Sequence, residues 1–102
     1  MAARTLTAFP EALEELLQER SISLRELGRR LGIDPTYLSR IQRGKKPVPA
    51  DLPERVAAAL GLPNDYFLEA RERIILEAIR REPKLRELVY ATISSQSPSQ
   101  AD

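Results

Sequence analysis

The strongest constraint on the fold is a pair of short apolar-periodic segments separated by a turn of only a few residues. The stretch LRELGRRLGIDPTYLSRIQRGK covers residues 24–45. Before it, Ser23 and Glu26 have the spacing of a capping box, and Gly32 is placed to end the helix that this box opens. An Asp-Pro pair at 34–35 then supplies the cap and the first residue of a second helix. The pattern therefore predicts two short helices joined by a tight turn.

The rest of the chain also indicates helices, without a strand pattern or an internal repeat. We expect a helix opened by Phe9 and Pro10, one over residues 52–60, a longer one capped by Asn64 that reaches about Arg81, and a last one over about 83–93. Gly44 should end the helix that follows the turn. The predicted fold class is all-α, with five helices in a head and a C-terminal helical extension. The expected core is Leu13, Leu16, Leu17, Ile22, Leu27, Leu31, Ile33, Leu38, Ile41, Val56, Ala57 and Leu60.

Composition argues against most enzymatic chemistry. The chain has no cysteine and no histidine, so it lacks a thiolate metal site, a disulfide framework and the commonest general base. We therefore expect no enzyme activity, no cofactor and no metal. No apolar run has the length of a membrane span, and the N-terminus lacks the apolar stretch of a secretory signal. A soluble, cytoplasmic protein without membrane contact is the expectation.

The charge is unevenly distributed along a chain whose net charge is only +1. Residues 20–55 hold nine basic and four acidic side chains, a net charge of +5. Residues 1–19 carry −3, and residues 56–102 carry −1. A basic segment within a nearly neutral chain favours an anionic partner. An ordinary solvated surface is the alternative.

Two short helices joined at residues 32–34 have helix-turn-helix geometry, in which the second helix lies in the major groove of DNA. Over residues 9–68 the sequence resembles the phage Cro/repressor-type helix-turn-helix family, often called the Xre family. The resemblance rests on the order of Leu27, Gly32, Ile33, Leu38, Ile41, Gly44, Lys45, Ala57, Leu60 and Gly61. It implies a five-helix, lambda-repressor-like domain. The implied function is a sequence-specific regulator of transcription, a dimeric repressor that binds double-stranded DNA at an inverted-repeat operator.

The resemblance also implies which residues read the bases from a recognition helix over 35–43. Arg40 is the strongest candidate, because its guanidinium can pair bidentately with guanine. Thr36 can hydrogen-bond a base edge or touch a thymine methyl group, and Ser39 is a secondary candidate. Pro35 can offer only an apolar contact, and its alternative role is to start the helix.

A second set of residues is implied to contact backbone phosphates. This set is Ser23, Arg25, Tyr37, Arg43, Lys45 and Lys46. For Tyr37, packing beside the turn is an equal alternative. The sequence departs from the family at Leu24, where a glutamine commonly contacts the backbone, so Ser23, Arg25 and local N–H groups would have to hold that phosphate. A common family ion pair is also replaced, because its two positions hold Leu17 and Gln42.

The domain organisation follows from these assignments. It comprises an N-terminal arm (1–8), the DNA-binding domain (9–68), a helical extension (69–93) and a disordered tail (94–102). The extension carries an apolar stripe wider than a surface helix needs, which favours dimerisation over packing back on the head. The predicted dimer contacts are Phe67, Ile74, Ile75, Ile79, Leu85, Leu88 and Val89. An alternative function is a protein-interaction module, such as an antitoxin-like partner protein that uses these C-terminal helices.

Overall fold

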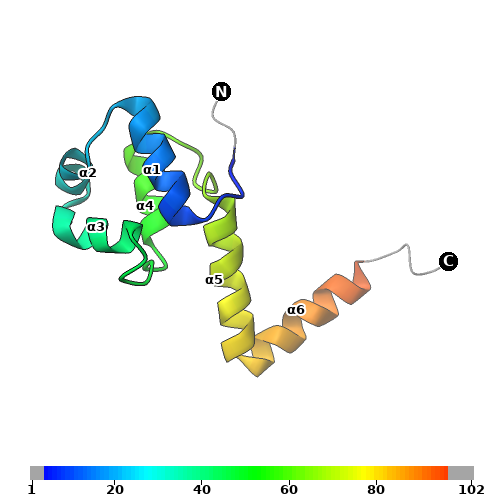
Figure 1. Cartoon of the computed structure of the whole chain (residues 1–102). Helices are drawn as coiled ribbons and strands as arrows, with labels where there is room; N and C mark the ends of the chain where they lie inside the picture. The colour runs from blue at the N-terminus through cyan, green and yellow to red at the C-terminus, as the bar shows by residue number, and fades with distance from the viewer. Residues whose placement is uncertain (1–3, 97–102) are drawn as a thin grey trace. The chain divides into compact units, whose positions relative to one another are not determined.

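The structure, a computed structural model, describes residues 4–96 and divides into two compact units at Glu72 and Arg73. We call residues 4–72 the N-terminal unit and residues 73–96 the C-terminal unit. An isolated β-bridge joins Thr5 to Phe67, and the described residues form no strand. The predicted all-α class is confirmed. The helices are α1 (Phe9–Arg20), α2 (Leu24–Leu31), α3 (Pro35–Gln42), α4 (Leu52–Ala59), α5 (Leu68–Arg81) and α6 (Pro83–Ser95) (Figure 1).

The two central helices begin and end where their capping residues require. The N–H of Glu26 donates to the hydroxyl of Ser23 at 3.0 Å, which confirms the predicted cap of α2. Gly32 ends α2 in the left-handed conformation, with φ 69°. The N–H of Thr36 donates to the Asp34 carboxylate at 3.0 Å, which caps α3. Because helices of eight residues are marginal in isolation, these caps act together with tertiary packing to define them.

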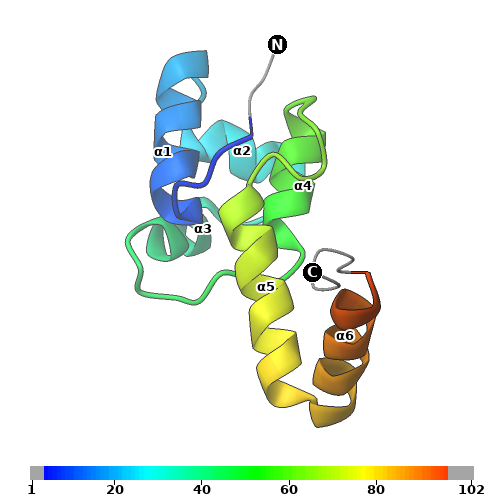
Figure 2. The same cartoon turned by 90° about the vertical axis from the view of Figure 1, so that its right-hand side faces the viewer.

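A single hydrophobic core holds the N-terminal unit together. Within it α3 packs against α1 and α2, and α4 packs against α2 (Figure 2). The rings of Phe9 and Phe67 meet edge to face with their centroids 4.8 Å apart. Ile22, Leu31 and Ile33 of the predicted core are only partly buried, but they pack against it. The other predicted core residues are buried, and so is Leu52, which was not predicted; the predicted ones are Leu13, Leu16, Leu17, Leu27, Leu38, Ile41, Val56, Ala57 and Leu60.

Gly28 sets how closely the turn approaches α2. A Cβ atom at this position would lie 2.5 Å from the carbonyl oxygen of Ile33, and that oxygen belongs to the backbone. The N–H of Ile33 in turn donates to the carbonyl of Gly28 at 2.9 Å. Only glycine allows this approach without a shift of the turn, so Gly28 helps to fix the position of α3 against α2.

The fifth helix begins later than the sequence predicts. Asn64 was the expected cap, but α5 begins at Leu68. The β-bridge with Thr5 holds Phe67 in an extended conformation, and the N–H of Thr5 donates to the carbonyl of Tyr66 at 2.9 Å. A contact with the N-terminal arm, distant in sequence, therefore overrides the local capping signal.

The C-terminal unit has no comparable core. None of the residues of α6 is buried, and in α5 only Ala70 is, which belongs to the N-terminal unit. The chain bends at Glu82, and Pro83 opens α6 as expected. The helix continues through Ser94 and Ser95, and the N–H of Gln96 donates to the carbonyls of Thr92 and Ile93 at 3.2 Å, so these three residues are not part of a disordered tail as predicted. The rest of the predicted tail, from 97 onward, lies outside the described residues.

Candidate nucleic-acid interface

One face of α3 points away from the core and carries polar side chains. Thr36, Ser39, Arg40 and Arg43 follow one another at the spacing of a single helical face. Leu38, on the opposite face, is fully buried. Thr36 and Arg40 are exposed, and Ser39 is half-buried. The two strongest candidates for base contacts are therefore open to a ligand from outside.

The remaining predicted residues of α3 lie at the edge of this face. Pro35 is half-buried and occupies the first position of the helix, so it serves as the helix start that was its alternative role. A Cβ built on Gly28 would also lie 3.4 Å from the Pro35 ring, which places that ring beside α2. Tyr37 is 38% exposed, so its ring is neither in the core nor fully in solvent.

Several cations of the N-terminal unit are held by partners within the protein. Arg29 and Arg30 both donate to the Glu26 carboxylate, at 2.5 and 3.0 Å. Arg20 donates to the Leu60 carbonyl at 2.8 Å, and Arg55 donates to the Leu31 carbonyl at 2.6 Å. The same pattern holds for the ion pairs Arg4–Asp65, Arg55–Asp51 and Arg71–Glu54.

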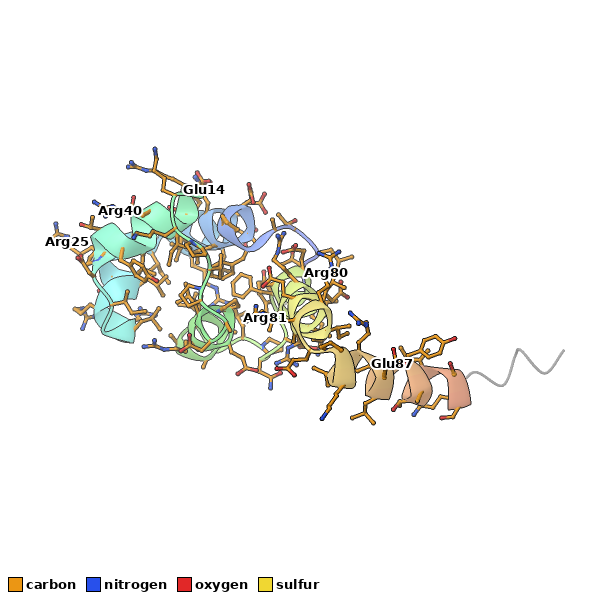
Figure 3. The ribbon with its side chains drawn as sticks, turned by 90° about the horizontal axis from the view of Figure 1, so that it is seen from below. Glu14, Arg25, Arg40, Arg80, Arg81 and Glu87 are labelled. Carbon is orange, nitrogen blue, oxygen red and sulfur yellow. The ribbon has the colours of Figure 1, made fainter. Side chains whose placement is uncertain are left out.

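The other cations of this unit lack such partners. Among the described residues, no ion pair and no side-chain hydrogen bond is formed by Arg25, Arg40, Arg43, Lys45 and Lys46. All of them are exposed. They lie at the start of α2, on α3 and in the loop that follows it. Figure 3 shows Arg25 and Arg40 projecting from the same end of the unit, away from the core.

Only part of the basic segment predicted over residues 20–55 is therefore available to an anionic partner in the structure. Arg20, Arg29, Arg30 and Arg55 belong to it by sequence but are engaged elsewhere. Glu26 forms ion pairs with two of them, Arg29 and Arg30. Its assignment to a capping box did not predict these ion pairs. The spacing of Glu26 to residues three and four positions later is a signal that could have revealed it. The hydrogen bonds from Arg29 and Arg30 lower the pKa of the Glu26 carboxyl below its ordinary value of 4.5.

The start of α2 can also accept a phosphate group. The Ser23 oxygen accepts the Glu26 N–H, which leaves its own O–H able to donate. The N–H groups in the first turn of a helix have no partner within the helix. Leu24 is half-buried and packs against the core, while the Arg25 side chain is exposed beside it. This end of α2 is thus electropositive even without the polar side chain common at position 24 in the resembled family.

The family ion pair that the sequence replaces leaves no unpaired charge behind. Leu17 is a buried member of the core, and Gln42 is half-buried at the end of α3. No charged side chain among the described residues is fully buried. Losing both partners of a pair together removes the cost of burying one charge alone.

The predicted dimer contacts fall into two groups. Phe67 is buried in the core against Phe9, so its assignment to a dimer contact is wrong: the ring contact and the β-bridge already occupy it. The other predicted contacts belong to the C-terminal unit. Of these, the exposed side chains are Ile75, Leu85 and Leu88, and the half-buried ones are Ile74, Ile79 and Val89.

Comparison with known proteins identifies the N-terminal unit. No curated protein and no solved structure matches the chain. In the described residues 4–96, no helix has the length and apolarity to cross a membrane. A family model described as a helix-turn-helix domain matches residues 8–67, which is more than half of the sequence. The chain therefore belongs to the helix-turn-helix domain family of DNA-binding proteins.

Proposed function

We propose that this protein is a sequence-specific regulator of transcription that reads the major groove of double-stranded DNA with α3. The proposal places it among Cro/repressor-type (Xre) regulators and makes it a repressor that acts as a dimer. The observation that supports it is where the unpaired and the paired cations lie in the N-terminal unit. The cations without partners all lie at the start of α2, on α3 or just after it, whereas the others are neutralised or bound to carbonyls.

The outward face of α3 supplies the proposed base contacts. Within residues 4–96 Arg40 forms no ion pair and no side-chain hydrogen bond, so its guanidinium can pair with the O6 and N7 atoms of a guanine. Thr36, one turn earlier on the same face, offers a hydroxyl and a methyl group. Ser39 extends this surface at the side, and Pro35 contributes apolar contact at its edge.

The flanking groups supply the proposed phosphate contacts. Arg43, Lys45 and Lys46 follow α3, and Ser23 with Arg25 opens α2, so the two sets flank α3 in the sequence. Contacts on both sides of a helix fix its register in the groove without reading sequence. Tyr37 can add its hydroxyl to the same set.

The C-terminal unit supplies the proposed dimer contact. Among its predicted contacts, Leu88 is 64% exposed and Ile75 is 52% exposed. A single layer of two helices cannot cover its own apolar faces, so a second copy of the unit offers matching apolar surface. Dimeric regulators of this class bind two half-sites about one helical turn apart, roughly 10 bp.

Selection of bound duplexes from a random pool tests the DNA-binding proposal. The full chain should enrich an inverted repeat, and its affinity for the enriched site should fall steeply with salt. Four phosphate-contacting cations correspond to a slope of log K against log salt of about −3 to −4 for each half-site. No enrichment, together with a flat salt dependence, would favour the interaction-module alternative.

Sedimentation of the full chain at micromolar concentration tests the dimer. We expect the wild type to sediment as a dimer and Leu88→Asp to sediment as a folded monomer, because a charge at an exposed apolar position disrupts association without entering a core. A monomeric wild type that binds an asymmetric site at full affinity would exclude the dimer. Repression is tested by a reporter whose promoter overlaps the selected site: its expression should fall when the protein is present.

A further inference from the structure

Three charged side chains of α2 form one cluster on its surface. The Arg29 guanidinium donates to both oxygens of the Glu26 carboxylate, with Nε 3.1 Å from Oε1 and a terminal nitrogen 2.5 Å from Oε2. The Nε atom of Arg30 donates to the same Oε2 atom at 3.0 Å. A bidentate pair that shares its carboxylate with a second arginine is stronger than a single exposed ion pair. One carboxylate therefore engages two guanidinium groups.

The cluster lies beside the residues proposed to contact phosphate at the start of α2. Glu26 is the third residue of this helix, and its N–H donates to the Ser23 hydroxyl. Arg29 follows Arg25 by one turn, so these two arginines share a face of α2. The side chain of Arg29 is 73% exposed, and Arg25 is exposed as well. Within residues 4–96 Arg25 forms no ion pair, so the two arginines differ in their pairing and not in their exposure.

The number of free cations beside DNA sets the part of the affinity that does not depend on sequence. Each cation that reaches a phosphate steepens the slope of log K against log salt by about 0.9. With Glu26 in place, α2 offers Arg25 as its one unpaired cation among the described residues. Without that carboxylate, α2 would offer three arginines, since Arg29 and Arg30 would have lost their acceptor.

We propose that Glu26 is a positioning residue that keeps Arg29 and Arg30 away from DNA phosphates and so limits the sequence-independent affinity of the protein. The inference rests on the proposed function, since phosphate contacts have meaning only if the protein binds DNA. The base contacts proposed for α3 do not involve this cluster. Glu26 therefore sets how strongly the protein holds any duplex, and α3 sets which duplex it prefers.

The test replaces Glu26 by glutamine in the full chain. Glutamine has a similar size, is accepted at the same position of a capping box and keeps the backbone N–H that Ser23 caps. Circular dichroism should therefore show an unchanged helix content, while the carboxylate that holds the two arginines is gone. Glu54→Gln is the matched control, because it removes the same charge and also breaks an ion pair, with Arg71, elsewhere in the N-terminal unit.

The first readout is a salt titration of binding to a duplex that lacks the selected site. Glu26→Gln should steepen the slope by about one to two units and raise the affinity roughly fivefold to thirtyfold at physiological salt, as one or two added phosphate contacts would. Its preference among bases at the selected site should equal that of the wild type. Glu54→Gln should change neither slope nor affinity. An unchanged slope in Glu26→Gln, or an equal change in Glu54→Gln, would overturn the inference.

The second readout asks whether Glu26 acts through the two arginines. Glu26→Gln is repeated in a chain in which Arg29 and Arg30 are both replaced by alanine. There it should leave the salt slope and the affinity unchanged, because no arginine remains to be released. If the carboxylate merely repels DNA, the substitution should raise the affinity as much in this chain as in the wild type, and that result would overturn the inference.

The third readout follows the arginines directly, by NMR of their Nε–H groups. In the wild type, addition of the duplex should shift the signal of Arg25 and leave those of Arg29 and Arg30 in place. In Glu26→Gln all three signals should shift. Shifts of the Arg29 and Arg30 signals in the wild type would show that DNA draws these side chains away from Glu26, which would contradict the proposed role.

These measurements separate failure of the role of Glu26 from failure of the proposed function. If the wild-type chain binds no duplex, the proposed function fails and the role of Glu26 falls with it. If the wild type binds the selected site with a steep salt dependence and Glu26→Gln behaves in the same way, the proposed function stands and the role of Glu26 is wrong.

Discussion

The helices of both units have periodic apolar residues, but only the N-terminal unit buries them in a core. In the N-terminal unit, four short helices and the first turn of α5 enclose a core in which Leu38, Ile41 and Val56 are fully buried. In the C-terminal unit, the end of α5 and all of α6 leave their apolar side chains half-buried or exposed. Periodicity thus identifies a helix and its apolar face, but the presence of a second layer decides whether that face is covered.

The two units also differ in the kind of side chain that they leave exposed. The N-terminal unit buries most of its large apolar side chains in one core and leaves cations exposed at the start of α2, on α3 and just after it. The C-terminal unit leaves apolar side chains open, with Tyr90 68% exposed. The first arrangement suits a polyanion and the second suits an apolar protein surface, so the two units are expected to take different partners.

The largest expected effect contrasts a leucine from each unit. Leu38→Ala should lower the free energy of unfolding by about 2–5 kcal/mol, because it leaves a cavity in a closed core. Leu88→Ala, at a 64% exposed position, should change it by less than about 0.5 kcal/mol at concentrations where the chain is monomeric. Chemical denaturation followed by circular dichroism measures both. Similar losses would show that the C-terminal unit has a core of its own.

A smaller effect is expected for base recognition. Arg40→Ala should lower discrimination at one guanine in each half-site by about 1–3 kcal/mol, because a bidentate donor is lost. Arg30→Ala is the matched control, since Arg30 is already paired with Glu26. Competition between the selected site and single-base variants measures the ratio. A uniform loss of affinity for every sequence would instead make Arg40 a phosphate contact.

The next prediction compares pairs of cations from the two units. Replacing both Lys45 and Lys46 by alanine should reduce the salt slope by about one to two units and leave base preference intact. Replacing Arg80 and Arg81 of the C-terminal unit (Figure 3) removes the same charge and should leave the slope unchanged. Salt titrations of both double variants provide the measurement. If the two slopes fall equally, net charge rather than position governs binding.

The smallest effect concerns a cation that the protein already neutralises. Arg29→Ala should raise the pKa of Glu26 toward its ordinary value of 4.5, because it removes the strongest hydrogen-bond donor to that carboxylate. The pKa of Glu26 is lower in the folded protein than in the unfolded chain. The ion pairs of Glu26 with Arg29 and Arg30 therefore stabilise the fold fully above about pH 4.5, and this stabilisation is lost as the pH falls through the folded pKa. Arg25 lies on the same helix and forms no ion pair with any residue from 4 to 96, so Arg25→Ala should leave the titration of Glu26 unchanged. NMR titration of the carboxyl carbon distinguishes the two variants, and equal shifts would contradict the pairing.

Much of the N-terminal unit was predictable from local signals. Capping by Ser23 and Asp34, termination at Gly32 and burial of Leu38 and Ile41 follow from spacing alone, and the structure confirms them. The start of α5 was not predictable, because its cap comes from Thr5 across the unit. The burial of Phe67 depends on the same long-range contact.

The candidate site was predictable only in outline. The helix after the turn and its outward-facing residues follow from the turn and the helical period, whereas the base-reading role proposed for them comes from the resemblance to the Xre family. The sequence does not predict which cations remain unpaired. Arg20 and Arg55 donate to backbone carbonyl oxygens that are distant in sequence, and local spacing cannot reveal these contacts. The close approach at Gly28 was missed for the same reason: it depends on where the Ile33 carbonyl lies.

Methylation protection of guanine N7 in the selected duplex tests the central claim most directly. This atom lies in the major groove, where Arg40 is proposed to bind it. The wild-type chain should protect one guanine in each half-site from dimethyl sulfate, and Arg40→Ala should leave that guanine reactive. Guanines that stay reactive in the wild-type complex, or protection confined to adenine N3 in the minor groove, would contradict major-groove reading by α3.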